Sequence, residues 1–175
     1  MKRITSWVGI LLFSSTLGAY DFNPGDFLVR GVLGSSVNVV HADGTPDAGM
    51  VLGLEAEYML APKVSLTGAI RPVLSGGFID LGFGIGAKYR WTREVLPFIP
   101  YVSVAMTPAF LIPTHAGQSM HFNWGLRPTA GCDYFVMRDL AVGLELALEP
   151  SYLFGSSGKN LEVSVDALLG ITWRF

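Results

Sequence analysis

The chain has 175 residues, of which 50% are hydrophobic and 15% charged, and its mean hydropathy of +0.44 is high for a soluble protein. After residue 20, however, no apolar run approaches the ~18–20 residues that a membrane-spanning helix needs, and 21 glycines and 10 prolines also disfavour helix. The formal net charge of −2 excludes a basic nucleic-acid interface, and the single Cys132 excludes an internal disulfide and a cysteine-based metal cluster.

Residues 1–19 have the three parts of a secretory signal peptide. Lys2 and Arg3 form a basic start, a short apolar segment follows, and small residues lead to Ala19. The apolar segment is too short for a membrane anchor, so we expect cleavage near Ala19. Residues 20–175 are then expected to form one domain, and the patterns described next indicate that it is an outer-membrane barrel.

Eight segments of this domain alternate apolar and polar side chains with a period of two, which places them on opposite faces of a strand. The alternation is clearest over residues 162–175 (EVSVDALLGITWRF), where Leu168 is the one large apolar residue on the polar face. Each segment is long enough for a tilted membrane strand, which needs about 9–11 residues. The expected strands are Asp26–Val40, Gly49–Leu60, Lys63–Leu74, Gly77–Trp91, Pro97–Ile112, His121–Phe135, Leu140–Tyr152 and Glu162–Phe175.

The connections between the segments alternate between short and longer, as in outer-membrane barrels with short periplasmic turns and longer external loops. An even number of strands returns the last strand to the side of the first, so both termini are expected in the periplasm. Ala61-Pro62, Thr92–Leu96 and Met137–Asp139 are short, His41–Ala48, Pro113–Met120 and Phe154–Asn160 are longer, and Ser75-Gly76 alone departs from the alternation.

Aromatic residues on the apolar face gather near both ends of the strands, as in the two girdles of a spanning barrel. A soluble sheet would carry polar side chains on its outer face instead of leucine and valine. The sequence therefore predicts an all-β fold, an eight-stranded antiparallel up-and-down transmembrane β-barrel. The girdle at the short-turn end comprises Tyr58, Tyr89, Trp91, Phe98, Tyr134, Trp173 and Phe175, and the other comprises Phe110, Phe122, Trp124 and Tyr152.

The polar face of the strands is expected to point into the barrel. The interior of an eight-stranded barrel is only wide enough for side chains, and charges buried there must be paired. We therefore predict a salt-bridge network that fills the lumen. Its members are Arg30, Glu55, Glu57, Arg71, Asp80, Lys88, Arg90, Arg127, Asp133, Glu145, Glu149, Asp166 and Arg174, with Glu162 on the same face.

The turns of the hairpins predict which charges lie opposite each other, because directly opposed residues on one face interact. We expect three cross-strand ion pairs, namely Arg71 with Asp80, Arg127 with Glu149, and Arg30 with Glu57.

Some inward positions are apolar or small, and Gly82, Gly84 and Gly86 are expected to leave local space. Such a lumen would admit a small apolar molecule; the alternative is that these side chains only fill space. The apolar inward residues are Val32, Val51, Met59, Val73, Ile99, Tyr101, Leu111 and Leu168.

Several stretches resemble the OmpW family of small outer-membrane barrels, with OmpA-like barrels as near relatives. They are GDFLVRGVLGSSVNVV, VLGLEAEYMLAPKVSLTGAI, FIPYVSVAMTPAFL, GCDYFVMRDLAVGLELALEPSY and the ending GITWRF. The resemblance implies an eight-stranded barrel that passes small hydrophobic molecules or acts as a receptor.

A third function, hydrolysis of lipid at the outer leaflet, would use residues of one longer loop. His115, Ser119 and His121 lie in or beside it, and Glu162 is a candidate acid nearby. Such chemistry needs a serine held by an oriented base, and the loop has no rigid signature for this. We therefore expect no enzymatic activity, and Cys132 is expected to be a small apolar filler on the lipid-facing side.

The expected function is therefore passage or binding of small hydrophobic molecules. The alternative is a structural or interaction barrel with a plugged lumen, and lipid hydrolysis, which the absence of a catalytic signature disfavours, comes third. No cofactor or metal site is expected, since the sequence has no metal-ligand spacing or nucleotide motif. The expected partners are membrane lipid and lipopolysaccharide, the barrel-assembly machinery and a small hydrophobic ligand, but no nucleic acid.

The end of the last strand leads to a first prediction. Trp173 and the terminal Phe175 share its apolar face and match the C-terminal signal by which outer-membrane barrels are recognised for assembly. Deletion of Phe175 is expected to impair assembly, measured as loss of the folded protein from the outer-membrane fraction. Normal folding and localisation of the deleted form would contradict this assignment.

Overall fold

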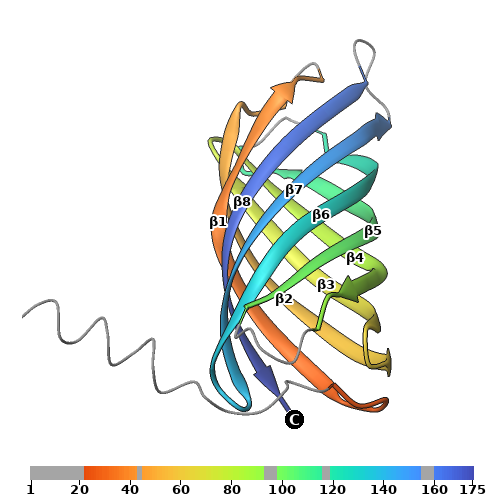
Figure 1. Cartoon of the computed structure of the whole chain (residues 1–175). Coiled ribbons are helices and arrows are strands. Elements are labelled where there is room, and N and C mark those ends of the chain that lie inside the picture. Colours follow the sequence, from red (N-terminus) through yellow and green to blue (C-terminus); the bar gives the residue numbers. More distant parts are fainter. Residues whose placement is uncertain (1–21, 43–44, 93–97, 116–118, 155–159) are drawn as a thin grey trace, which may run out of the picture.

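The structure is a computed structural model that describes residues 22–42, 45–92, 98–115, 119–154 and 160–175. Within these residues, eight antiparallel strands form a closed barrel in which sequence neighbours pair and β1 pairs with β8 (Figure 1). The strands are β1 (Phe27–Val40), β2 (Ala48–Ala61), β3 (Val64–Ser75), β4 (Phe78–Arg90), β5 (Phe98–Pro113), β6 (His121–Met137), β7 (Leu140–Phe154) and β8 (Leu161–Arg174).

This is the fold that the alternation predicts, and every strand end lies within two residues of its expected position. The largest differences are in β6 and β7. Strand β6 continues to Met137, which pairs with Leu140 across a two-residue turn, and β7 continues to Phe154. The expected signal peptide lies outside the described residues, as does Pro97. No helix in the described part of the chain is long and apolar enough to cross a membrane.

The two ends of the barrel differ, and we name them by what they hold (Figure 1). The terminal end holds the start of β1, the end of β8 and the two-residue turns at 62–63 and 138–139. The loop end holds the β1–β2, β5–β6 and β7–β8 connections and the Gly76-Gly77 turn. In this two-residue turn Gly77 has a φ of 95°, a left-handed conformation that favours glycine.

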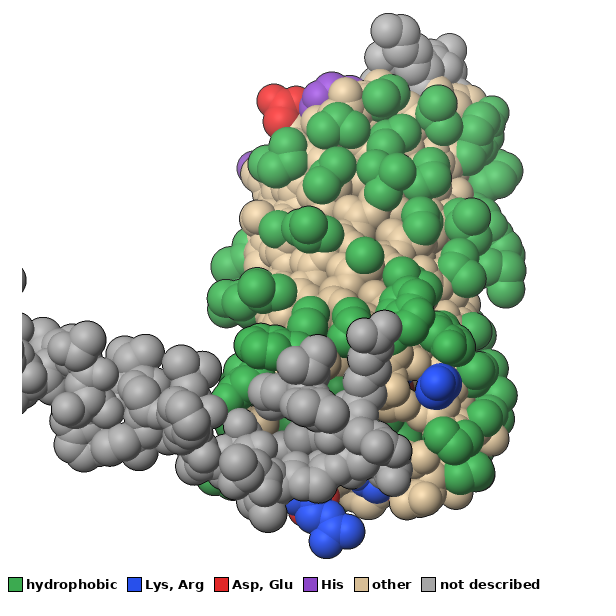
Figure 2. Space-filling view, viewed as in Figure 1, with side chains coloured by type: hydrophobic (Ala, Val, Ile, Leu, Met, Phe, Trp, Pro, Cys, Tyr) green, Lys and Arg blue, Asp and Glu red, His purple; other side chains and the backbone are tan. Residues whose placement is uncertain are grey.

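The outer wall of the barrel is apolar over most of its height (Figure 2). Most of the residues expected to face outward are exposed; Ile85, Leu144 and Leu54, for example, are 70%, 64% and 63% exposed. A soluble monomer does not expose a continuous apolar band of this extent, whereas a transmembrane barrel presents one to lipid. The wall therefore supports the membrane-spanning interpretation.

Aromatic side chains form contacts at both rims of this wall. At the loop end, the Phe122 ring lies 5.4 Å from that of Phe110 and 5.7 Å from that of Phe154, which in turn lies 5.1 Å from Tyr152. Phe154 belongs to this girdle although we expected it in a loop. At the terminal end the pairs are Tyr89 with Trp91 and Phe98 with Tyr134.

Two of the three expected ion pairs are wrong because the register differs by two residues. In the β3–β4 hairpin, Arg71 lies opposite Gly82 and Asp80 opposite Val73. The turn is centred one residue later than expected, on Gly76-Gly77, and a shift of one in the turn centre displaces the register by two.

In the β1–β2 hairpin, Arg30 lies opposite Glu55 instead of Glu57. Its ion pairs are made beyond the neighbouring strand β8, with Glu145 of β7 and Asp133 of β6. The reason is that Gly170 and Gly143 leave room for the long arginine side chain to pass over the wall toward these carboxylates.

Candidate functional site

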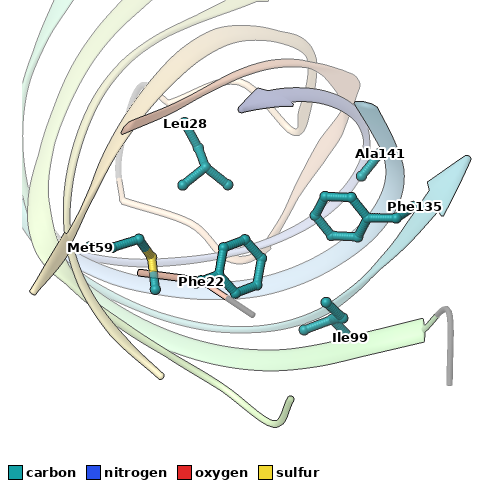
Figure 3. Close-up of a cluster of buried hydrophobic side chains, with 6 residues drawn as sticks. All are labelled: Phe22, Leu28, Met59, Ile99, Phe135 and Ala141. Atoms are coloured by element: carbon teal, nitrogen blue, oxygen red, sulfur yellow. The ribbon is translucent and has the colours of Figure 1, made fainter. Parts of the chain in front are cut away.

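The candidate site is the barrel interior, which is layered from one end to the other. At the terminal end lies an apolar cluster that we call the terminal cap (Figure 3). Each of its side chains is at most 1% exposed. The terminal cap comprises Phe22, Leu28, Met59, Ile99, Phe135 and Ala141.

Phe22 reaches the lumen because the chain before β1 folds back into the barrel mouth. The Gly25 N–H donates to the Met59 carbonyl at 2.8 Å, and the Met59 N–H donates to the Asp26 carbonyl at 2.9 Å. Gly25 has a φ of 97°, so this turn favours glycine. The Phe22 ring packs edge-on against Phe135 with centroids 5.9 Å apart. The sequence interpretation missed Phe22, because it lies outside the alternating segments.

Arg174 was expected in the lumen network but lies at this mouth instead. Its Nη2 is 2.7 Å from Asp26 Oδ2, and its guanidinium carbon is 5.4 Å from the Phe22 ring centroid. The side chain therefore ties the end of β8 to the folded-back segment before β1, since it contacts Asp26 and Phe22 there.

Behind the terminal cap lies a cluster of ion pairs that we call the central network. Arg90, which is fully buried, donates to both oxygens of Glu57 at 2.9 and 2.7 Å and to Asp133 Oδ2 at 2.6 Å. Lys88 contacts Glu55 and also Glu57, the latter at 3.0 Å. The charges thus join strands β2, β4 and β6 across the lumen.

Tyr101 is the centre of this network, although the sequence interpretation treated it as an apolar inward residue. Its hydroxyl accepts a hydrogen bond from Arg30 and donates one to Glu145 at 2.9 Å. Its ring lies beneath three cations, with Lys88, Arg90 and Arg30 4.6, 5.3 and 5.4 Å from the centroid. A tyrosine supplies both an aromatic face for cations and a hydroxyl for a carboxylate.

Arg127 extends the network toward the loop end. Its Nη1 lies 3.1 Å from Glu149 Oε2, so the expected ion pair between Arg127 and Glu149 is confirmed. Arg127 also forms ion pairs with Asp166 and, at 3.4 Å, with Glu145. Arg71 adds a further pair, with its Nη2 2.9 Å from Glu55 Oε2.

Inward glycines make room for these large side chains. A Cβ atom at Gly131 would overlap Tyr101, one at Gly143 would overlap Asp133, and one at Gly170 would overlap Arg30. In contrast, the space expected at Gly84 and Gly86 is not open. A Cβ at Gly84 would lie 3.4 Å from Arg71 Nη1, and Gly86 approaches the Val104 carbonyl closely.

Between the central network and the loop end lies a space of about 70 Å³, lined by charged, polar and apolar side chains, that we call the outer cavity. Asp80 lies here, and its one side-chain hydrogen bond among the described residues comes from Asn123 at 3.5 Å. Glu162 also lines the cavity and accepts a hydrogen bond from Asn38. Sequence alternation places Asp80 and Glu162 on the inward face but does not show that neither forms an ion pair with a described residue.

The residues of the hydrolase hypothesis are not joined in a catalytic arrangement within the described chain. His115 contacts Thr114, with 3.3 Å between Nδ1 and Oγ1, and Glu162 is engaged by Asn38. No hydrogen bond between described residues links Ser119 to His115 or His121. Nor do the described residues contain a group of three or more His, Cys, Asp or Glu side chains suited to hold a metal ion. Cys132 is a free, partly exposed thiol.

Comparison with solved structures identifies the fold. The N-terminal barrel domain of OprF from Pseudomonas aeruginosa matches with a TM-score of 0.63 and 14% identity, covering 91% of this chain and 100% of that one. OprG from the same organism matches with 0.61 and 17%, covering 90% and 99%. Neisserial surface protein A matches with 0.64 and 17%, covering 87% and 98%.

These likenesses show that the chain has the fold of eight-stranded outer-membrane β-barrels. At such identities they show the fold and not a shared activity. No protein-family model matches the chain, and no curated protein sequence matches it. The membership of this chain in the OmpW family therefore stays a prediction from its sequence.

The central network predicts a large effect of removing one charge. In Arg90→Met, Asp133 loses its 2.6 Å partner and Glu57 loses two hydrogen bonds inside the barrel. We expect a loss of about 3–5 kcal/mol in the free energy of unfolding, since a buried charge is left uncompensated. Urea unfolding in lipid vesicles measures it.

The matched control is Arg138→Met, which makes the same change at an exposed residue and is expected to alter stability by no more than about 0.5 kcal/mol. A triple variant with Arg90→Met, Glu57→Gln and Asp133→Asn should recover part of the loss. Equal stability of Arg90→Met and Arg138→Met would contradict the role of the network.

Proposed function

We propose that the protein is an outer-membrane barrel with a closed lumen, which works through its wall and its loop end and does not conduct solutes. The observation that carries the proposal is the continuous filling of the terminal half of the interior. There the terminal cap and the central network follow one another, and Tyr101, Arg90 and Arg127 are each at most 2% exposed.

Passage of small hydrophobic molecules through the lumen is not favoured by this interior. The outer cavity carries four carboxylates, and beyond it a solute would meet the ion pairs of the central network. Moving past them would require breaking buried pairs, each of which costs several kcal/mol.

Residence in the outer membrane is part of the proposal. The apolar wall and its two aromatic girdles support it, as does the likeness to OprF, OprG and Neisserial surface protein A. The absence of enzymatic activity is also proposed, because Ser119 has no hydrogen bond to His115 or His121 among the described residues. Membership in the OmpW family is part of the proposal as well, since the sequence stretches that resemble this family lie in a barrel of eight strands.

A second candidate function, the binding of a small hydrophobic molecule, is favoured by a groove on the outer wall. This wall groove has a volume of about 810 Å³ and crosses β1, β2, β3, β7 and β8. Gly31 forms part of its floor, and no atom would lie within 4 Å of a Cβ there. Its register partners Leu54 and Ile171 form the sides, and Trp173 lines it toward the terminal end.

The closed lumen predicts the absence of conductance. The purified protein in planar lipid bilayers is expected to give no stepwise ionic current. Phe22→Ala should also be silent, because the central network lies directly behind the terminal cap, and Phe27→Ala on the outer wall serves as its matched control. Current steps that scale with inserted protein and disappear after heat denaturation would contradict the proposal.

The wall groove makes a separate prediction. With Trp91→Phe and Trp124→Phe, Trp173 is the one tryptophan left in the described chain, and a brominated alkane in the groove should quench its fluorescence saturably. Gly31→Leu fills the groove and should remove most of this quenching. Gly68→Leu is the control, because Gly68 is also an outward strand glycine with open space but does not line the groove. Equal quenching in both variants would mean that the alkane reaches Trp173 from bulk lipid.

A further inference from the structure

The outer cavity has an unbalanced charge. Its lining contains four carboxylates and two guanidinium groups, a formal difference of two negative charges. Arg127 is occupied by Asp166 and Glu149, and Arg71 by Glu55, which lies outside the cavity. In the described residues, neither Asp80 nor Glu162 forms an ion pair, and His41, the base whose charge acts on Glu162, lies 3.4 Å from Asp47 Oδ1.

Such an excess is costly in a confined space. An ionised carboxylate that leaves water needs a counter-charge as well as hydrogen bonds, and the amides of Asn123 and Asn38 supply only the latter. Water within the cavity would satisfy hydrogen bonds but would not change the charge. Within the described part of the chain, no ion-paired base offsets these two carboxylates.

A second, independent feature points into the same space. Thr107 is only 4% exposed, and its hydroxyl has no hydrogen-bond partner among the described residues. Asp80 Oδ1 and Asp166 Oδ1 are likewise buried without a hydrogen-bond partner, and all three residues line the outer cavity. The Nε donors of Arg71 and Arg127 are unpartnered there too, and water is able to satisfy them.

The chemistry of the free acceptors selects the kind of cation. They are carboxylate and hydroxyl oxygens, and the lining contains no histidine or cysteine. Oxygen donors suit hard cations, and among these Ca²⁺ accepts irregular sets of carboxylates, hydroxyls and water, whereas Mg²⁺ demands a near-octahedral set. A site for one water needs roughly 10–15 Å³, so a cavity of about 70 Å³ holds an ion with several waters.

We propose that the outer cavity binds one hard divalent cation of the Ca²⁺ kind, held by Asp80 and Thr107 with Glu162 or Asp166 as the second carboxylate. The ion would neutralise the two excess negative charges. Because no three acidic side chains of the described chain converge, most ligands would be water and hydroxyl oxygens. The dissociation constant should then resemble those of weak extracellular calcium sites, about 10⁻⁴–10⁻³ M.

The test uses lipopolysaccharide-free protein refolded in a nonionic detergent, with CaCl₂ as the probe and choline chloride to hold the ionic strength constant. Calorimetric titration gives the dissociation constant, and the temperature at which the folded band is lost on a gel gives the stability. We expect Ca²⁺ to raise this temperature, since a ligand that binds only the folded state stabilises it.

Two variants identify the site. Asp80→Asn removes one charge at the same volume and should weaken Ca²⁺ binding about tenfold or more. Thr107→Val keeps every charge and removes only the hydroxyl, so a roughly fivefold loss would mark Thr107 as a direct ligand. Asp47→Asn is the matched control, because Asp47 lies in the β1–β2 connection with its side chain 95% exposed.

The proposal is overturned if Ca²⁺ neither binds nor stabilises the folded protein, which would mean that the carboxyl groups hold protons instead. It is also overturned if Asp80→Asn binds Ca²⁺ as well as the parent, or if Na⁺ alone gives the effect. Folding of each variant is checked by its gel mobility without Ca²⁺. Conductance of the barrel is measured separately, so a failure here leaves the closed-lumen proposal standing.

Discussion

The pairing of charges inside a lumen too narrow for bulk water is the constraint on which this barrel depends. Arg90 satisfies it by joining Glu57 on β2 and Asp133 on β6, so that one side chain connects opposite walls. With such pairs in place, half of every strand can be polar while the other half faces lipid. The inward glycines follow from the same constraint. A side chain at these positions would overlap Arg30, Tyr101 or Asp133.

The balance of charge along the axis divides the interior into parts with different roles. In the central network, acids and bases match closely, and the terminal cap covers them with Phe22 and Phe135. Toward the loop end the acids exceed the bases among the described residues, and Asp80 lines the outer cavity there. The central network, in which the charges are paired, is suited to closing the barrel. The outer cavity, in which carboxylates are in excess among the described residues, is suited to binding a cation from the external side.

The strands could be predicted from the sequence because a period of two is a local property that each strand carries by itself. The register of the β3–β4 hairpin could not be predicted in the same way. When the centre of the turn moves by one residue, as at Gly76-Gly77, each residue lies opposite a partner two positions away from the expected one. Partners across the lumen, such as Arg90 with Asp133, depend on closure of the barrel and have no local signal. Phe22 was missed because nothing alternates around it, and Tyr101 because its hydroxyl matters only once Arg30 and Glu145 are beside it.

The glycines of the barrel wall fall into two groups. Some face inward and make room for large side chains of the interior, whereas others, such as Gly31 in the wall groove, face outward. Gly170 faces inward and cannot carry a side chain without displacing Arg30 from Glu145, so packing alone accounts for it. Gly31 faces outward with no atom near, so the interior places no demand on it. The packing of the ion pairs that close the lumen therefore does not require the hollow at Gly31. For this reason the proposed binding at the wall and the proposed closure of the interior can be tested by separate substitutions.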